Sequence, residues 1–232
     1  MTAQRIFLAL QDVDGAGRAS QDAAKAGFLE NSQLDWDKIY TANTNEQAAY
    51  VLYYDAADDS QFTVNSVGNL EMTDKIQVNF GVSYKMLNSD NYAKIDDLLG
   101  SDFHVDMDPF SNTLNDITGT IQKRSGDIFN YHYRMNASYG DAFAQFRYNR
   151  NKWDVFLAGN YSSTGYQRDG VFQNERFLDN SEGESTAVKF NNYGFKGGFS
   201  YKLNGRHWLV AHGAHLTSPP VLQNVFINPR EN

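Results

Sequence analysis

The sequence FTVNSVGNLEMTDKIQVNFGVSYKM, residues 62–86, decides the fold class. After Lys75 the apolar side chains occupy every second position, and these are Ile76, Val78, Phe80, Val82, Tyr84 and Met86. Before Thr73 the apolar residues Phe62, Val64, Leu70 and Met72 also share one parity. Successive side chains of a β-strand point to opposite faces of the sheet, so the stretch predicts a hairpin with one apolar face and one polar face.

Short turns alternate with long polar connections along the rest of the chain. The turns are expected at 73–75, 149–152 and 203–206, and Asn204-Gly205 in the last of them is a strong hairpin signal. The long connections are expected at about 88–126, at 166–187 and from 217 onward. This pattern predicts an antiparallel up-and-down meander in which 62–72 pairs with 76–86, 134–148 with 153–164, and 190–202 with 207–216.

Residues 1–45 have a different character from residues 46–232, where the period-two pattern holds. A short helix is expected at Ser20–Leu29, and Asp35 is placed to cap a helical turn over 35–40. The sequence therefore predicts a loop region with short helices over 1–45 and a β-sheet region over 46–232.

Composition excludes several classes of protein. The chain of 232 residues contains no Cys, which removes disulfides and thiolate metal sites, and its formal charge of −8 argues against nucleic acid as a partner. The longest apolar run, Ala48–Tyr54, is far shorter than the ~18 residues that a membrane helix requires. The apolar segment Ile6–Leu10 is too short for a signal peptide, so we expect neither a helical anchor nor an export signal.

No motif in the chain indicates catalysis or a bound cofactor. The five histidines lack the spacing of a metal site, and neither a nucleophile elbow nor a dinucleotide-binding loop is present. We therefore expect a protein that is not an enzyme and binds no cofactor. Asp102, Asp106 and Asp108 could gather a hard cation in a long loop, although acidic loop residues are more often simply solvated.

The hairpin has the dimensions of an outer-membrane strand pair. Eleven residues at about 3.3 Å each, tilted by about 40°, rise about 27 Å, close to the roughly 25 Å apolar band of such barrels. The residues expected to face lipid are Ile76, Val78, Phe80, Val82 and Tyr84. Aromatic residues flank the short turns, either as ordinary cross-strand pairs or as an interfacial girdle, which the loop asymmetry favours; they are Phe146, Tyr148, Trp153, Tyr201 and Trp208.

Several loop and turn segments, in this order, resemble TonB-dependent receptors from Bacteroidetes outer membranes. The segments are Asp96–Phe103, Asp106–Phe110, Gly126–Tyr131, Tyr166–Gly170, Asn192–Gly198, Lys202–His207 and Ile227–Arg230. The resemblance covers roughly residues 30–232 and implies part of a barrel of about 22 strands around an N-terminal plug. The predicted fold is therefore all-β, with the meander forming part of a large transmembrane β-barrel that has long extracellular loops and short periplasmic turns.

The resemblance implies active uptake of a nutrient: a siderophore, cobalamin, an oligosaccharide or a peptide. It further implies that outer-membrane lipid, the rest of the barrel and plug, the TonB complex and a surface lipoprotein are partners, and that residues 1–45 are extracellular. Candidate substrate-binding residues in the loops are Trp36, Asp102, Asp106, Asp108 and Arg168. Two other readings remain open: a soluble β-sheet protein that binds carbohydrate, and a surface structural protein without a ligand.

Overall fold

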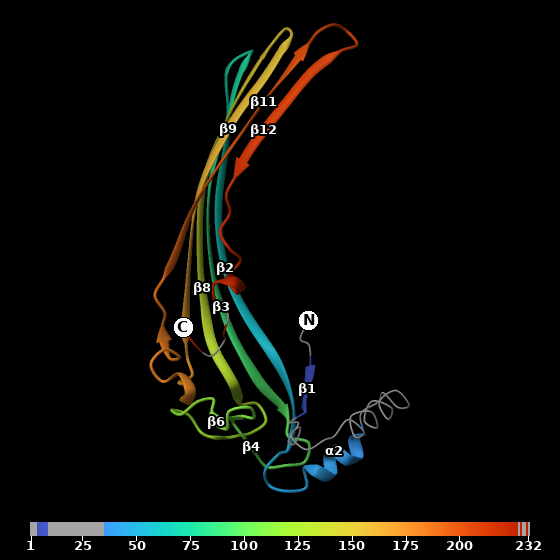
Figure 1. The fold of residues 1–232 in the computed structure, drawn as a ribbon, viewed down its shortest axis with the longest axis vertical. Coiled ribbons are helices and arrows are strands. Elements are labelled where there is room, and N and C mark those ends of the chain that lie inside the picture. Colours follow the sequence, from blue (N-terminus) through green and yellow to red (C-terminus); the bar gives the residue numbers. More distant parts are fainter. Residues whose placement is uncertain (1–3, 9–34, 227, 229–230, 232) are drawn as a thin grey trace.

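One long, curved antiparallel sheet dominates the computed structural model, which describes residues 4–8, 35–226, 228 and 231 (Figure 1). The sheet has eight strands in the order β1-β2-β3-β8-β9-β11-β12, with β10 paired to β9, and every neighbouring pair is antiparallel. Its strands are β1 (Gln4–Leu8), β2 (Tyr50–Thr73), β3 (Ile76–Asp97), β8 (Ile128–Arg150), β9 (Trp153–Gly170), β10 (Gly183–Glu184), β11 (Val188–Lys202) and β12 (Trp208–Leu216). The predicted all-β meander is confirmed.

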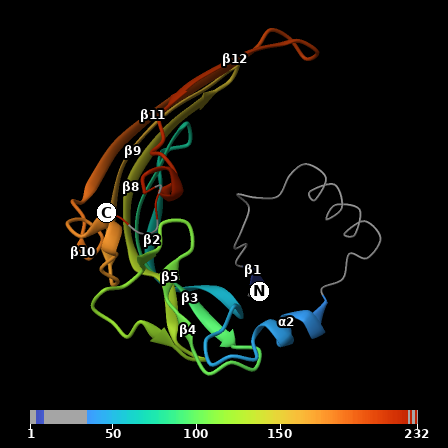
Figure 2. The same cartoon turned by 60° about the horizontal axis from the view of Figure 1, so that its bottom comes forward.

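The remaining elements are short and gather at one end of the sheet, apart from η2 (Figure 2). They are α2 (Trp36–Ala42), β4 (His104–Val105), β5 (Met107–Asp108), β6 (Thr113–Leu114), β7 (Gln122–Lys123), η1 (Glu175–Phe177) and η2 (Leu222–Asn224). We call the end of the sheet where these elements gather the loop end; segments 98–127 and 171–187 form it. The opposite end is the short-turn end.

Three compact turns close the short-turn end, as the sequence predicts, and polar side chains shape them. The Thr73 hydroxyl accepts hydrogen bonds from the backbone amides of Lys75 and Ile76, at 3.3 and 3.1 Å. Asn151 adopts a left-handed φ of 49° between β8 and β9, which asparagine tolerates better than most residues. The Asn204 side chain accepts from the amides of Arg206 and His207, so the last turn is longer than a two-residue hairpin loop.

The three expected strand pairings are present, but β2, β3 and β9 run further toward the loop end than predicted. The β2–β3 ladder continues from Phe62–Met86 to Leu52–Asp97, and β9 reaches Gly170 rather than stopping near residue 165. Alternation of apolar and polar residues fades in these extensions, because polar side chains occupy both faces there. Backbone pairing does not need that alternation, so the ladder persists where the sequence pattern ends.

The N-terminal region departs in part from expectation. Asp35 caps α2 as predicted, its carboxylate accepting from the Lys38 amide at 3.2 Å. Residues Gln4–Leu8, expected within a loop region, instead form β1 and pair with residues 50–54 of β2. The helix expected at Ser20–Leu29 lies outside the described residues.

The buried hydrophobic core is small and lies at the loop end. It consists of Ala48, Val51, Ala93, Ile95, Leu98 and Phe129, with Tyr53 and Tyr131 packed against it. Asn43 joins α2 to this core: it is fully buried, donates to the carbonyls of Tyr50 and Leu98, and accepts from the amides of Ala49 and Tyr50. The core therefore anchors only one end of strands that are up to 24 residues long.

Candidate functional site: a two-faced sheet and its polar loop end

One face of the sheet is apolar and exposed, and we call it the apolar face. Directly opposed residues in an antiparallel ladder share a face, so the register places Phe80 beside Gly68 and Ala144, and carries the face onward through Gly159 to Phe195. Phe80 is 49% exposed and Phe195 is 62% exposed. Further exposed members are Phe62, Val64, Leu70, Met72, Val82, Tyr84, Met86, Phe146, Trp153, Leu157, Tyr161, Tyr193 and Leu209.

The five residues expected to face lipid all lie on this apolar face. Ile76, Val78, Phe80, Val82 and Tyr84 alternate along β3 and pair with residues of the same face on β8. In water, monomeric proteins rarely expose contiguous apolar patches of more than a few hundred Å². An apolar surface that spreads over six strands therefore requires a covering.

Four of the five expected girdle residues lie together on the apolar face near the short-turn end. Trp153 pairs directly with Tyr201, and their ring centroids are 4.5 Å apart. Phe146 and Tyr148 belong to the same face of β8. Trp208 does not: it pairs with Lys202 on the opposite face, and the Lys202 ammonium lies 4.9 Å from its ring centroid.

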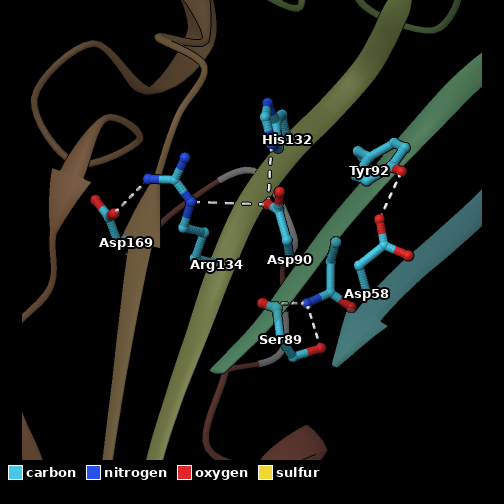
Figure 3. A network of polar contacts seen from close by, with 8 residues as sticks. Asp58, Ser89, Asp90, Tyr92, His132, Arg134 and Asp169 are labelled. Atoms are coloured by element: carbon cyan, nitrogen blue, oxygen red, sulfur yellow. Dashed lines mark hydrogen bonds and ion pairs between the residues drawn. The ribbon is translucent and has the colours of Figure 1, made fainter. Parts of the chain in front are cut away.

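A polar belt ends the apolar face on the side of the loop end (Figure 3). The Tyr92 hydroxyl donates to Asp58 at 2.8 Å, and this hydrogen bond raises the pKa of Tyr92 to about 12. His132 Nε2 lies 2.9 Å from Asp90, and Arg134 lies between Asp90 and Asp169, at 3.9 and 3.5 Å. The belt crosses β2, β3, β8 and β9, so the change from apolar to ionic side chains occurs at one level of the sheet.

The other face, which we call the polar face, carries amides, hydroxyls and charges. The Asn69 side chain donates a hydrogen bond to Asn79 between β2 and β3, and Ser83 donates one to Asp141 between β3 and β8. Arg147 forms a bidentate ion pair with Asp154. A cavity of about 350 Å³ lies on this face near the short-turn end, lined in part by Gln145, Arg147, Asp154, Lys196 and His212.

The segment after β12 returns along the polar face toward the loop end, on the concave side of the sheet (Figures 1 and 2). The Tyr166 hydroxyl donates to the carbonyl of Pro220 at 3.2 Å, and Pro219 contributes to a cavity with Gln61 and Lys85. The polar face is therefore the inner side of the curve and the apolar face is the outer side.

The loop residues singled out by the sequence do not form one site. Trp36 is the exposed first residue of α2, and Asp102 is exposed in the segment before β4. Arg168 is only 1% exposed: its guanidinium donates to the Ser181 carbonyl at 3.1 Å, its carbon centre lies 5.2 Å from the Tyr133 ring centroid, and burial lowers its pKa. Arg168 therefore holds segment 171–185 against the sheet.

Asp106 and Asp108 are buried but do not form the cation cluster that the sequence allowed with Asp102. Within the described part of the chain, no three His, Cys, Asp or Glu side chains gather as a metal site. Asp108 closes a local turn by accepting from the Phe110 amide at 3.0 Å. Asp106 Oδ1 accepts from Asn115 Nδ2 at 2.8 Å and from the Asn130 amide at 2.9 Å. Burial raises the pKa of Asp106 despite these two hydrogen bonds, which act in the opposite direction.

His104, Asn115 and Asn130 complete the surroundings of Asp106, and sequence reasoning missed the two asparagines. Burial lowers the pKa of His104. The residues line a cavity of about 90 Å³ together with Asp108 and the exposed side chains of Met107 and Phe110. The asparagines lie 9 and 24 positions along the chain from Asp106, and no local motif relates them to it.

Comparisons with protein-family models, curated proteins and solved structures found no match to this chain. In the part of the chain that the structure describes, no helix is long and apolar enough to span a membrane.

Proposed function

We propose that the chain forms part of the wall of an outer-membrane transporter of the TonB-dependent receptor type, which takes up a nutrient actively. The observation that carries the proposal is the exposed apolar face, with aromatic residues at the short-turn end and an ionic belt at its other limit. From Met72 to Phe62 the chain makes ten steps, which at about 3.3 Å and a tilt of about 40° rise about 25 Å. This height equals the roughly 25 Å apolar band of outer-membrane barrels.

The polar inner face supports the same proposal. Ion pairs and amide contacts such as Arg147–Asp154 and Asn69–Asn79 suit a surface in contact with water or with a polar plug. In a soluble sandwich the apolar faces of two sheets would meet in a core about 10 Å thick. Among the described residues, no second sheet covers the apolar face, and the two additional two-stranded sheets are β4–β7 and β5–β6 in the loops.

Open strand edges favour a wall segment over a complete barrel. Within the described residues, β12 has a neighbour only on its β11 side, and β1 covers only residues 50–54 of β2. Unpaired backbone groups are costly in hydrocarbon, so membrane-spanning sheets close into barrels. The proposal therefore includes further strands and a plug as partners, with coupling to TonB through that plug and a surface lipoprotein as a further partner.

Single cysteines test the orientation, because the chain has none of its own. Phe80→Cys and Asn79→Cys place a thiol on the apolar and the polar face of the same strand. With a fluorophore on the cysteine in the complete receptor in phospholipid vesicles, we expect quenching by a lipid-attached nitroxide at position 80 and much weaker quenching at position 79. Equal quenching at both positions, or none at position 80, would contradict the membrane orientation.

A further inference from the structure

The cavity beside Asp106 has three buried polar atoms without hydrogen-bond partners among the described residues. These atoms are Asp106 Oδ2, Asn115 Oδ1 and His104 Nδ1. Asp106 is 2% exposed and Asn115 is 3% exposed, and all three residues line the same 90 Å³ cavity. Leaving a buried polar atom without a partner is costly, so three such atoms around one cavity favour binding of a group that can donate hydrogen bonds.

The three atoms share one chemistry, because each can accept a hydrogen bond. The amide nitrogen of Asn115 is already committed to Asp106 Oδ1, which leaves its oxygen as an acceptor. Asp106 Oδ2 is the free oxygen of a carboxylate, and His104 Nδ1 accepts when the ring carries its proton on the other nitrogen. Burial lowers the pKa of His104 and so favours the neutral ring.

A primary ammonium group matches this set of acceptors. It offers three N–H donors and one positive charge, against three acceptors of which one is a carboxylate. The charges near the cavity are negative on Asp106 and Asp108 and positive on Lys123, which is close enough to lower the pKa of Asp106. The cavity is also well below the 300–1,000 Å³ of a site for a drug-sized molecule.

The rim of the cavity is apolar, which suits an aliphatic stem behind the ammonium. Met107, Pro109 and Phe110 line it, and Phe110 is 94% exposed. An aromatic side chain so exposed gains little from its own fold and is free to contact a ligand. A lysine side chain combines an apolar stem with an ammonium tip.

We propose that the loop end carries a binding site for a primary ammonium group on an aliphatic stem, as in the lysine side chain of a peptide. The Asp106, Asn115 and His104 acceptors bind the ammonium, and the side chains of Met107, Pro109 and Phe110 contact the stem. This inference does not depend on the membrane placement, because the site lies in segments 104–115 and 129–130 at the loop end.

Ligand titrations of the full chain in detergent micelles test the site. The probe is Nα-acetyl-lysine amide, followed by saturation-transfer NMR; the norleucine analogue keeps the stem without the ammonium, and the ε-trimethyl analogue keeps the charge without N–H donors. Glycinamide tests whether the α-ammonium of a peptide terminus is accepted instead. We expect binding of the lysine probe, weaker binding of glycinamide, and no saturable binding of the other two analogues.

Variants connect the binding to the named residues. Asp106→Asn should weaken binding of the lysine probe by about tenfold or more, because a charge-assisted hydrogen bond is lost. Asp102→Asn removes an exposed carboxylate of the same loop and should change binding by less than about twofold. If Asp106→Asn does not retain the β-sheet circular dichroism of the parent, Phe110→Ala is used in its place. We expect Phe110→Ala to weaken binding of the lysine probe several-fold.

Several results would overturn the inference. They are equal binding of the lysine and norleucine probes, unchanged binding in a folded Asp106→Asn, unchanged binding in Phe110→Ala, or displacement of the lysine probe by stoichiometric Ca²⁺ alone. Loss of the lipid quenching at position 80 would contradict the membrane proposal and leave this site standing. Conversely, a chain that is quenched by lipid and does not bind the lysine probe would retain only the membrane proposal.

Discussion

Lysine substitutions on the two faces of β3 can distinguish a sheet that lies in a membrane from a sheet that is exposed to water. Phe80 lies on the apolar face between Gly68 and Ala144, and its ring occupies the space above Gly68 that a side chain would fill. Asn79 is the adjacent residue on the polar face and accepts a hydrogen bond from Asn69. We expect Phe80→Lys to be costly in phospholipid vesicles and Asn79→Lys to be tolerated.

The expected free-energy cost of each substitution follows from the surroundings of the side chain that it replaces. In lipid, a lysine near the midplane of an outer-membrane barrel costs about 2–4 kcal/mol. In water, Phe80 is 49% exposed, and since full burial of such a side chain is worth about 1.5–3 kcal/mol, its loss would cost about 1 kcal/mol. Asn79→Lys resembles an ordinary surface substitution and should cost less than about 1 kcal/mol in either environment.

Urea unfolding of the complete receptor and of its two variants in phospholipid vesicles measures the difference in free energy of unfolding. A cost for Phe80→Lys at least about 1 kcal/mol above that of Asn79→Lys supports the membrane wall. Equal costs for the two variants, or a cost for Phe80→Lys of no more than about 1 kcal/mol, would refute the reasoning.

Three further predictions concern the loop end. Asn43→Ala removes all four hydrogen bonds of a fully buried side chain and should cost about 3 kcal/mol or more, seen as faster proteolysis near α2. An effect as small as that of Thr44→Ala would contradict this prediction. Gly170→Ala places a methyl group against the Ser181 carbonyl and should cost about 2 kcal/mol, whereas Gly205→Ala, with open space around it, should be neutral in the same unfolding assay. Because burial raises the pKa of Asp106, its contribution to stability is present below pH ~4 and lost as the pH rises through the raised pKa. The stability of the parent chain relative to Asp106→Asn should therefore fall as the pH rises above ~4, and a rise would contradict the prediction.

The hairpins were predictable because their information is local. The alternation over 62–86 and the polar residues of the turns fix both the pairing and the faces within a few positions of the chain. The strand extensions beyond Met86 carry no such alternation, so only the backbone ladder reveals them. Trp208, expected in the girdle, lies on the face opposite the other four aromatic residues. Its pairing with Lys202 sets that face, and the apolar residues of its own strand do not alternate cleanly enough to reveal it.

The loop end could be predicted only in part, since its contacts join distant segments. Asp106 and Arg168 stand out in the sequence as charged loop residues, but their environments depend on Asn115, Asn130 and Ser181. Arg168 illustrates the consequence. A charged residue expected to meet a ligand is instead buried against Tyr133 and holds a loop in place.

The two proposals fit one orientation of the molecule. Asn130, whose amide donates to Asp106, precedes the belt residues His132 and Arg134 on β8, so the ammonium site lies beyond the polar belt and away from the short turns. With the apolar face in lipid and the short turns toward the periplasm, the loop end projects into the external medium. A site that selects an ammonium on an aliphatic stem would then lie where an incoming peptide first meets the wall. If the loop end instead lay on the periplasmic side, the ammonium site would face the plug and not the medium.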